Sequence, residues 1–384
     1  MDPTPSLVRA VDLTEVLADI RELVECESPS ADLAAVARSA DVLARVGERR
    51  LGVAPERIVL DGRTHLRWRL GAGPSPVLLL GHHDTVWPVG TLAARPCTVE
   101  GGVLRGPGCF DMKAGVAMML HAAAGLEGVT ILVTGDEELG SPSSRALVEE
   151  EARAARAALV LEASAEGGAL KTERKGVSLY EVRVQGRAAH AGLEPEAGVN
   201  ATVELAHQAL AVAGLGREDL GTTVTPTLVR SGTTTNTVPA AGSFAVDVRV
   251  RTRAEQDRVD AAMQSLRPVV PGARIEVGGG PNRAPLEAAA SAELLERARV
   301  LAGRTGLPAP TAASVGGASD GNFTAGVGTP TLDGLGAVGG GAHADDEHVL
   351  VDELPGRTAL LAALVADLLV QPTNQLVATG GRRP

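Results

Sequence analysis

The 384-residue sequence predicts an α/β fold in which a domain with a mostly parallel sheet is interrupted by a smaller, ferredoxin-like α+β domain. In the first part of the chain, short apolar strands alternate with helical segments, which is typical of a parallel sheet covered by helices. After about Lys175 the order changes to β-α-β-β-α-β, the ferredoxin-like arrangement, and from about Glu287 the α/β pattern returns. We therefore expect a first domain formed by residues 1–175 and 287–384, and an inserted domain formed by residues 176–286.

The expected elements of the first domain follow from amphipathic stretches and short apolar runs. Helical patterns cover Leu13–Glu25 and Ala31–Leu51, and an extended segment then leads to the apolar run Pro76–Gly81. Such a run, bounded by glycine, is typical of a buried parallel strand. The pattern continues with a helix, a strand, a helix and a strand, over Met112–Ala124, Val129–Thr134, Ser143–Ala154 and Ala158–Leu161.

The inserted domain has its own pattern of strands and helices. Four strands are expected over Val177–Val184, Thr222–Arg230, Ser243–Arg251 and Ala273–Val277, and two helices over Ala197–Val212 and Ala254–Arg267. In the third strand, apolar residues alternate with Asp247 and Arg249. Because successive side chains of a strand point to opposite faces, Arg249 is expected on the face opposite the apolar side chains.

Composition and charge exclude several classes of partner. The chain carries 36 Lys and Arg against 47 Asp and Glu, a net charge of −11, and has no basic stripe of the kind that binds nucleic acid. The most apolar late segment, Thr358–Val370, is short and contains Asp367, so a core helix is expected there and no membrane span. The amino-terminal segment lacks the basic start and apolar run of a secretion signal. With three cysteines and no disulfide pattern, a cytoplasmic location is expected.

Histidines and carboxylates follow the apolar runs, at the points where strands are expected to end. His82 and Asp84 come directly after the first run, and parallel strands bind ligands beyond their carboxyl ends. A histidine that binds metal needs its second ring nitrogen held, usually by a carboxylate, and Asp84 could do this. Taken alone, His82 could equally be an ordinary loop histidine.

Four more segments offer side chains of the same kinds. Asp111 lies in a Gly/Pro loop that enters a helix, where it could also be an N-cap. The acidic cluster Asp136–Glu138 and the single Glu162 each follow an apolar strand, where plain solvent exposure is the alternative, and His343 follows a glycine-rich stretch. Oxygen and imidazole ligands without thiolates suit zinc, cobalt or manganese. Five ligands would serve two ions if one carboxylate bridges them.

Eight segments resemble, in order and spacing, the motifs of the di-zinc metallopeptidase family that contains glutamate carboxypeptidase, aminoacylase and succinyl-diaminopimelate desuccinylase. Five of them are GHHDTV, RGPGCFDMKAG, TGDEELGS, LVLEAS and HADDE, which begin at Gly81, Arg105, Thr134, Leu159 and His343. Three more, GRAAHAG, NTVP and DVR, resemble motifs of that family's inserted domain. The resemblance covers nearly the whole chain and points to the glutamate carboxypeptidase branch.

The resemblance implies a zinc-peptidase catalytic domain with a role for each matching residue. His82 and Glu162 would hold one Zn²⁺ ion, Glu138 and His343 would hold the other, and Asp111 would bridge the two ions. Co²⁺ or Mn²⁺ are possible substitutes for zinc.

Two further residues of the same motifs are implied to act in catalysis. Asp84 would orient His82, and Glu137, beside the ligand Glu138, would be the general base that takes a proton from a water molecule. As in that family, the Asp111–Met112 peptide bond would be cis.

The inserted domain is implied to serve as a dimerisation and lid domain. His190 would stabilise the oxyanion that forms on the substrate, in its own subunit or in the partner of a homodimer, and Asn236 would lie beside it. Arg249 would bind a carboxylate of the substrate, for which a solvated arginine is the alternative. Arg283 is a second candidate for that contact.

The sequence therefore predicts metal-dependent hydrolysis of an amide bond next to a free carboxylate, most simply by a glutamate-type carboxypeptidase acting on a small peptide. An N-acyl-amino-acid deacylase is the alternative. A silent binding scaffold is a remote one, because Glu137 and all five ligands are present. The roles of His83, where the family usually has an apolar residue, and of Cys109 stay open.

Overall fold

The computed structural model describes residues 11–73 and 75–370, and these residues form two compact units. Of the described residues, the first unit comprises 11–73, 75–172, 289–313 and 319–370, and the second comprises 173–288 and 314–318. The short segment Ser314–Ala318, which the sequence analysis places in the first domain, groups with the second unit.

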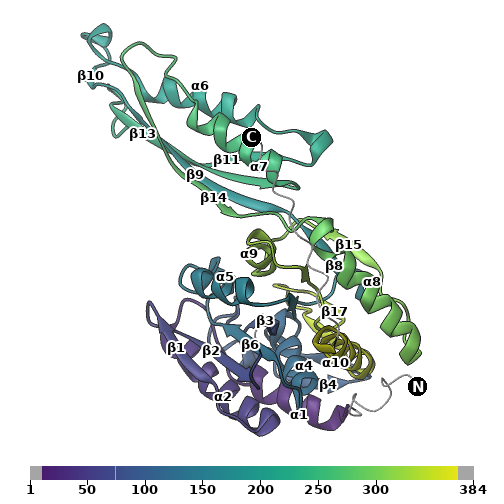
Figure 1. The fold of residues 1–384 in the computed structure, drawn as a ribbon. Coiled ribbons are helices and arrows are strands. Elements are labelled where there is room, and N and C mark those ends of the chain that lie inside the picture. Colours follow the sequence, from purple (N-terminus) through teal and green to yellow (C-terminus); the bar gives the residue numbers. More distant parts are fainter. Residues whose placement is uncertain (1–10, 74, 371–384) are drawn as a thin grey trace, which may run out of the picture. The chain divides into compact units, whose positions relative to one another are not determined.

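The first unit is built on a six-stranded sheet with the order β1-β2-β6-β3-β7-β16 (Figure 1). In that order the strands are Glu56–Leu60, Arg63–Leu70, Val129–Thr134, Val77–His82, Ala157–Val160 and Thr331–Leu332. β3 runs parallel to β6 and β7, and β16 runs parallel to β7, whereas β1 and β2 are antiparallel to their neighbours. The predicted, mostly parallel main sheet is confirmed.

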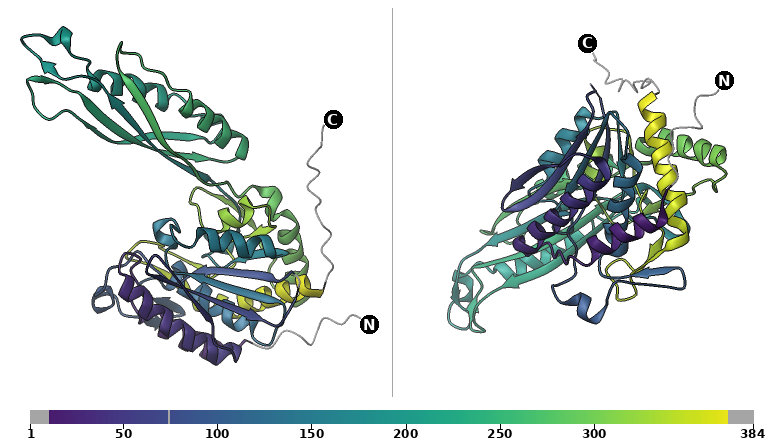
Figure 2. Two further views of the ribbon diagram at one scale, coloured as in Figure 1. Left: turned by 60° about the vertical axis from the view of Figure 1, so that its left-hand side comes forward. Right: turned by 90° about the horizontal axis from the view of Figure 1, so that it is seen from below.

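Helices cover both faces of this sheet. They are α1 (Leu13–Val24), α2 (Leu33–Leu51), α4 (Ala114–Ala123), α5 (Arg145–Ala154), α8 (Ala288–Thr305), α9 (Gly321–Gly326) and α10 (Leu354–Val370), with the short α3 (Thr91–Ala94) in a loop. In β3, Leu79 faces a core that contains side chains of α1, α2, α4 and α10, whereas Leu80 faces a second core with α5 and α9. Figure 2 (left) shows the purple α1 and α2 and the teal α5 on opposite sides of the sheet. A strand covered on both faces explains the continuous apolar run of β3.

A small antiparallel sheet, β17-β18-β5-β4, brings two loops together in the first unit. Its strands are Gly339–Gly340, His348–Leu350, Val103–Arg105 and Thr98–Glu100. β18 pairs with β5, with His348 opposite Arg105. Since these two strands are neighbours, the loop 341–347 before β18 and the loop 106–111 after β5 leave the sheet side by side.

The second unit is a four-stranded antiparallel sheet with two helices over one face (Figure 1). Its elements are β9 (Gly176–Gln185), α6 (Ala201–Ala213), β11 (Thr223–Ser231), β13 (Ala241–Val250), α7 (Arg253–Gln264) and β14 (Arg274–Arg283). The strand order is β11-β13-β9-β14, and side chains of both helices share one core with the sheet. The short strands β10 (Ala189–His190) and β12 (Thr237–Val238) pair with each other, and β8 (Leu170–Arg174) pairs with β15 (Ala312–Val315).

The ends of the first two helices follow from local chemistry. The Asp12 carboxylate accepts the N–H groups of Thr14 and Glu15 at the start of α1, and Asp32 caps α2 in the same way. α2 ends at Gly52, whose φ of 72° is a left-handed conformation that costs glycine little. These caps explain why both helices lie close to their predicted bounds.

Within residues 11–73 and 75–370, no helix is both long and apolar enough to cross a membrane. The core helix expected late in the chain is α10, in which Leu361 and Leu364 are fully buried. The first ten residues, which belong to the segment judged to lack a secretion signal, lie outside the described residues. A cytoplasmic location stays a prediction from the sequence.

Candidate metal centre

Three neighbouring parallel strands deliver candidate ligands at one edge of the main sheet. His82 is the last residue of β3, and Glu137 and Glu138 lie in the turn that directly follows β6. Glu162 follows the end of β7. Because β6, β3 and β7 are adjacent and parallel, their carboxyl ends bring these side chains together.

Asp111 joins this group from the loop after β5, and its two oxygens face two different histidines. Asp111 Oδ1 lies 3.3 Å from His82 Nε2, and Asp111 Oδ2 lies 3.3 Å from His343 Nε2. On the outer sides, Glu162 Oε1 lies 3.6 Å from His82 Nε2, and Glu138 Oε2 lies 3.1 Å from His343 Nε2. The arrangement is a row with one carboxylate between two histidines and one glutamate at each end.

The donor set fits a pair of divalent cations. His82 Nε2 is buried and makes no hydrogen bond with the described residues, although the carboxylates of Asp111 and Glu162 lie 3.3 and 3.6 Å from it. Ligand atoms of His82, Asp111 and Glu138 lie within 4.8 Å of one another, and so do those of His82, Glu137 and Glu162. Clustered carboxylates repel one another, and oxygen and imidazole donors without thiolates match ions such as Zn²⁺.

The carboxylates of this row raise the pKa values of its two histidines. Hydrogen bonds with Asp111 and Glu138 raise the pKa of His343 to about 10. Burial lowers the pKa of His82, but the nearby carboxylates of Asp111 and Asp84 outweigh it and hold this pKa well above its usual value. Both raised pKa values reflect the negative charge around the imidazoles, and a bound cation would compete with protons for the same ring nitrogens.

Asp84 organises the ends of two strands at once. Its Oδ1 accepts the backbone N–H of Glu137 and its Oδ2 accepts that of Glu138, each at 3.2 Å, and Oδ2 also accepts the Ser30 hydroxyl at 2.6 Å. His82 Nδ1 lies 2.9 Å from the backbone carbonyl of Asp84 and 3.4 Å from its carboxylate. The predicted orientation of His82 by Asp84 thus involves its backbone oxygen as well as its side chain.

The loop that carries Asp111 has a backbone of unusual shape. Cys109–Lys113 forms a wide turn before α4, and the Asp111–Met112 peptide bond is cis, as the resemblance implied. Gly108 has φ 72°, and a Cβ there would lie 2.4 Å from Thr85 Cγ2. Gly115 has no room for a Cβ either, because it would lie 2.1 Å from the Leu161 carbonyl oxygen. Glycine at these two positions lets the loop approach the strand ends.

Glu347 is a residue of this site that sequence reasoning missed. In the sequence it is one of several acids that follow His343. In the structure the residue is only 3% exposed, and its carboxylate accepts the N–H groups of Phe110 and Asp111 at 2.9 and 3.0 Å. It also accepts from Gly108 N and Trp87 Nε1, both at 2.8 Å. The only feature of the sequence that points to Glu347 is its position, four residues after the candidate ligand His343.

Two neighbours of the ligands have structural roles. Asp136 accepts the N–H and hydroxyl groups of Ser143 and Ser144 at the start of α5, so this member of the acidic cluster faces away from the row. His83 is buried, with its ring nitrogens near Ser39 Oγ and the Thr64 carbonyl, and burial lowers its pKa to about 4.

Cys109, whose role the sequence left open, is completely buried. Burial raises the pKa of its thiol far above the usual value. A thiol in this state is neutral and packs as a small apolar group.

In the second unit, His190 and Asn236 lie at the paired strands β10 and β12. His190 is opposite Thr237, and the Asn236 carbonyl accepts the N–H of Ala191 at 2.9 Å. His190 is exposed, and its Nδ1 accepts the N–H groups of Gly192 and Leu193 at 3.1 and 3.2 Å. An accepting Nδ1 places the proton of the neutral ring on Nε2, which can therefore donate a hydrogen bond.

Arg249 lies on the expected face of β13, because the apolar residues that alternate with it are buried. Its Nε and Nη2 donate to the two oxygens of Asp247 at 2.8 and 2.9 Å. Its guanidinium thus already binds one carboxylate bidentately and leaves Nη1 outside this pair. Arg283 is 7% exposed, which makes it the less accessible of the two arginines.

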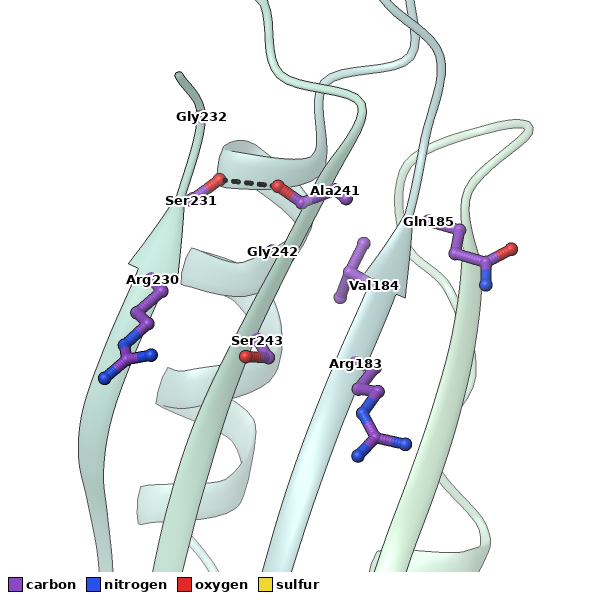
Figure 3. Close-up of a pocket in the computed structure, with 9 residues that line it drawn as sticks. All are labelled: Arg183, Val184, Gln185, Arg230, Ser231, Gly232, Ala241, Gly242 and Ser243. Atoms are coloured by element: carbon purple, nitrogen blue, oxygen red, sulfur yellow. Dashed lines mark hydrogen bonds between the residues drawn. The ribbon is translucent and has the colours of Figure 1, made fainter.

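The same face of the second unit carries a shallow groove of about 380 Å³ (Figure 3). Figure 3 shows the side chains of Arg183 and Arg230 along it, and Ser231 Oγ donates to the Ala241 carbonyl at 3.3 Å. Arg183 pairs with Glu181 and lies 3.9 Å from Glu276. The lining has no histidine, cysteine or carboxylate, so it does not resemble the row of ligands in the first unit.

Comparisons with known proteins agree with this fold. Residues 78–367 match the profile of Peptidase family M20/M25/M40. Carboxypeptidase G2 from Pseudomonas sp. (strain RS-16) is 32% identical over 314 residues, which cover 78% of this chain and 75% of that protein. Succinyl-diaminopimelate desuccinylase from Xanthomonas oryzae pv. oryzae (strain PXO99A) is 28% identical over 349 residues, 83% of this chain and 91% of that protein. The structure of aminopeptidase PepT from Bacillus cereus ATCC 10987 has a TM-score of 0.71 at 22% identity and covers 94% of this chain and 99% of its own.

Proposed function

The chain belongs to peptidase family M20/M25/M40, a family of metal-dependent peptidases and amidohydrolases, and on that premise we propose that it is a two-metal carboxypeptidase of the glutamate type. The observation that carries the proposal is the position of Asp111, whose two oxygens each lie 3.3 Å from a different histidine. A carboxylate with one oxygen towards each histidine is suited to bridge two ions.

The proposed ligands divide into two sets around Asp111. His82 and Glu162 would hold one ion, and Glu138 and His343 the other. We propose Zn²⁺, with Co²⁺ or Mn²⁺ as substitutes, because the donors are imidazole and carboxylate groups. When bound, such a pair lowers the pKa of water and polarises an amide carbonyl.

Glu137 is the proposed general base. Its carboxylate belongs to the cluster with His82 and Glu162, and its backbone N–H is held by Asp84. It would accept a proton from the attacking water and return it to the leaving nitrogen of the amide. His190, with its proton on Nε2, would donate to the oxygen on which negative charge develops, with Asn236 beside it.

The proposed substrate is a small peptide or N-acyl amino acid with a free carboxylate next to the cleaved amide. Arg249 would bind this carboxylate through the part of its guanidinium that Asp247 leaves available. Arg283 is the second candidate, although it is largely buried. An acidic protein repels an anionic substrate, so a local arginine is needed to hold it.

A matched pair of substrates tests this proposal. Wild type should hydrolyse a peptide with a free C-terminal glutamate more efficiently than the same peptide with an amidated α-carboxylate. The lost arginine contact should cost about 1.5–3 kcal/mol in kcat/KM. Products are identified by mass spectrometry, so the cleaved bond is known.

Two variants assign the contact to Arg249. Arg249→Lys should remove most of the preference for the acid, because a lysine cannot bind Asp247 bidentately and still present a second, fixed donor to the substrate as the guanidinium does. Asp247→Asn, the control, should keep or increase the preference, because it frees the fork. Equal rates on acid and amide with wild type would refute both the anchor and the carboxypeptidase proposal.

An N-acyl-amino-acid deacylase is the second candidate, favoured by the similarity to a succinyl-diaminopimelate desuccinylase. Both candidates use the same metal row and the same carboxylate next to the amide. They differ in the group released, so N-acyl amino acids in the same assay distinguish them. Efficient release of an acyl group, with no cleavage of the glutamate peptide, would favour the deacylase.

We also propose a homodimer formed through the second unit. β11 is an edge strand of its sheet, and it contacts α6. Both elements expose apolar side chains: Val203 (45%), Leu210 (76%), Leu228 (69%) and Val229 (60%). An edge strand beside an apolar helix surface is suited to pair with a second copy of itself.

Mixing two inactive variants tests whether His190 acts across this dimer. If it does, mixed dimers of His190→Ala and Glu137→Gln contain one site with both defects and one with neither. About a quarter of wild-type activity should then return, since about half of the dimers are mixed. Subunit exchange, followed with tagged chains, is the control, and exchange without any recovery would show that His190 acts within its own subunit.

A further inference from the structure

The carboxylate of Glu347 accepts four hydrogen bonds beside the metal row, and the proposed mechanism gives it no role. Its Oε1 accepts from Phe110 N and Asp111 N, at 2.9 and 3.0 Å. Its Oε2 accepts from Gly108 N and from the Trp87 indole N–H, both at 2.8 Å. Three of the four donors are backbone groups of the loop that carries Asp111.

The geometry requires an acceptor at both oxygens of residue 347. All four partners are N–H groups, and none of them can accept a hydrogen bond. A carboxylate offers two accepting oxygens, whereas an amide would turn an NH₂ group towards two N–H donors. Since Glu347 is 3% exposed, water would not readily replace the lost partners, and each unsatisfied donor carries a desolvation penalty.

Glu347 also connects parts of the site that are far apart in the sequence. It lies four residues after His343 in the loop 341–347, next to the loop 106–111 because β18 and β5 are paired. The Trp87 ring, which donates to Glu347, is covered by the Arg95 guanidinium 3.9 Å from the ring centroid. Arg95 in turn pairs with Asp345 of the same loop at 3.1 Å.

We infer that Glu347 is a positioning residue, whose buried carboxylate holds the backbone of the Asp111 loop so that the bridging carboxylate faces both histidines. This inference rests on the proposed two-metal site. Partners that hold a metal ligand in place commonly set metal affinity, and their loss weakens it about 10–100-fold. Because Asp111 faces both histidines, the binding of both ions depends on Glu347.

Metal titration of four metal-free proteins tests the inference: wild type, Glu347→Gln, Trp87→Phe and Asp346→Asn. Zn²⁺ is added in competition with a chromophoric chelator, and the Co²⁺ absorption spectrum reports the ligand geometry. Glu347→Gln should weaken both binding steps about 10–100-fold and alter the Co²⁺ spectrum. Trp87→Phe, which keeps an aromatic ring but removes one donor, should weaken them about fivefold.

Asp346→Asn is the matched control, because it removes an equal charge from the same loop at an exposed position. It should leave both affinities within about twofold of wild type. Thermal unfolding of the metal-free proteins separates positioning from general stability. A residue that is merely structural would lower the unfolding temperature and leave the Zn²⁺ affinities and the Co²⁺ spectrum unchanged.

The outcomes separate this inference from the proposed function. A folded Glu347→Gln protein that binds both ions as wild type does would overturn the inference and leave the two-metal proposal in place. If Glu347→Gln does not fold, Trp87→Phe decides, and wild-type affinities in that variant would overturn the inference. A wild-type protein that binds fewer than two ions would overturn the proposed function and this inference with it.

Discussion

Glu137→Gln is expected to lower kcat about 10³-fold while the protein keeps its metal ions. The carboxylate of Glu137 lies in the cluster with His82 and Glu162, but Glu137 is not one of the proposed ligands. The glutamate beside His343 in the row is Glu138. Glutamine has the same shape and cannot accept the proton of the attacking water. Steady-state kinetics on the best substrate and elemental analysis of the same preparation give the two quantities.

The neighbouring Glu138→Gln is the control for this prediction. Glu138 lies 3.1 Å from His343 Nε2, so its loss should reduce metal content as well as activity. The two adjacent substitutions thus separate proton transfer from metal binding. A Glu137→Gln protein with near wild-type kcat would show that another group is the base.

Asp111→Ala is expected to lose both ions and all measurable turnover. Each Asp111 oxygen lies 3.3 Å from one histidine, so removing the side chain takes a ligand from both ions and leaves the two histidines unbridged. Asp111→Asn keeps the shape but offers one oxygen, and it should retain at most about one ion. The measurement is metal content after dialysis without chelator.

The control for Asp111→Ala is a check that the variant is folded. Circular dichroism should show a folded protein, because the Asp111 N–H is still held by Glu347. If the folded alanine variant kept two tightly bound ions, Asp111 would not be the bridge, and the ligand assignment would be wrong.

Sequence patterns predicted the strands and their ends well, for a simple physical reason. β3 and β6 are buried along their whole length, so both are mainly apolar, and the polar residues that follow mark the edge of the sheet. Since parallel strands end at one edge, His82 and Glu162 could be expected close together before any coordinates.

Element ends failed where local backbone overrides the pattern. The helix expected from Met112 begins at Ala114, because the wide turn at Cys109–Lys113 precedes it. The strand expected to end at Val277 continues to Arg283 through three glycines. In the structure Gly279 has φ 88° and no room for a Cβ beside the Leu179 carbonyl, so glycine continues the strand here.

The long-range hydrogen bonds of the site could not be predicted from the sequence. Glu347 accepts from residues that precede it by more than two hundred positions, and no local pattern marks such a contact. The hydrogen bonds between Arg249 and Asp247 could not be predicted for a different reason. Alternation placed both on one face, but only coordinates show that their side chains bind each other.

The metal content of wild-type protein, purified without chelator, tests the central claim most directly. If the row from Glu162 to Glu138 holds two ions, elemental analysis should give about two equivalents of divalent metal per chain, and chelation should abolish hydrolysis. Returning Zn²⁺ should restore the activity. Full activity with less than about one equivalent, unchanged by chelation, would contradict a two-metal hydrolase.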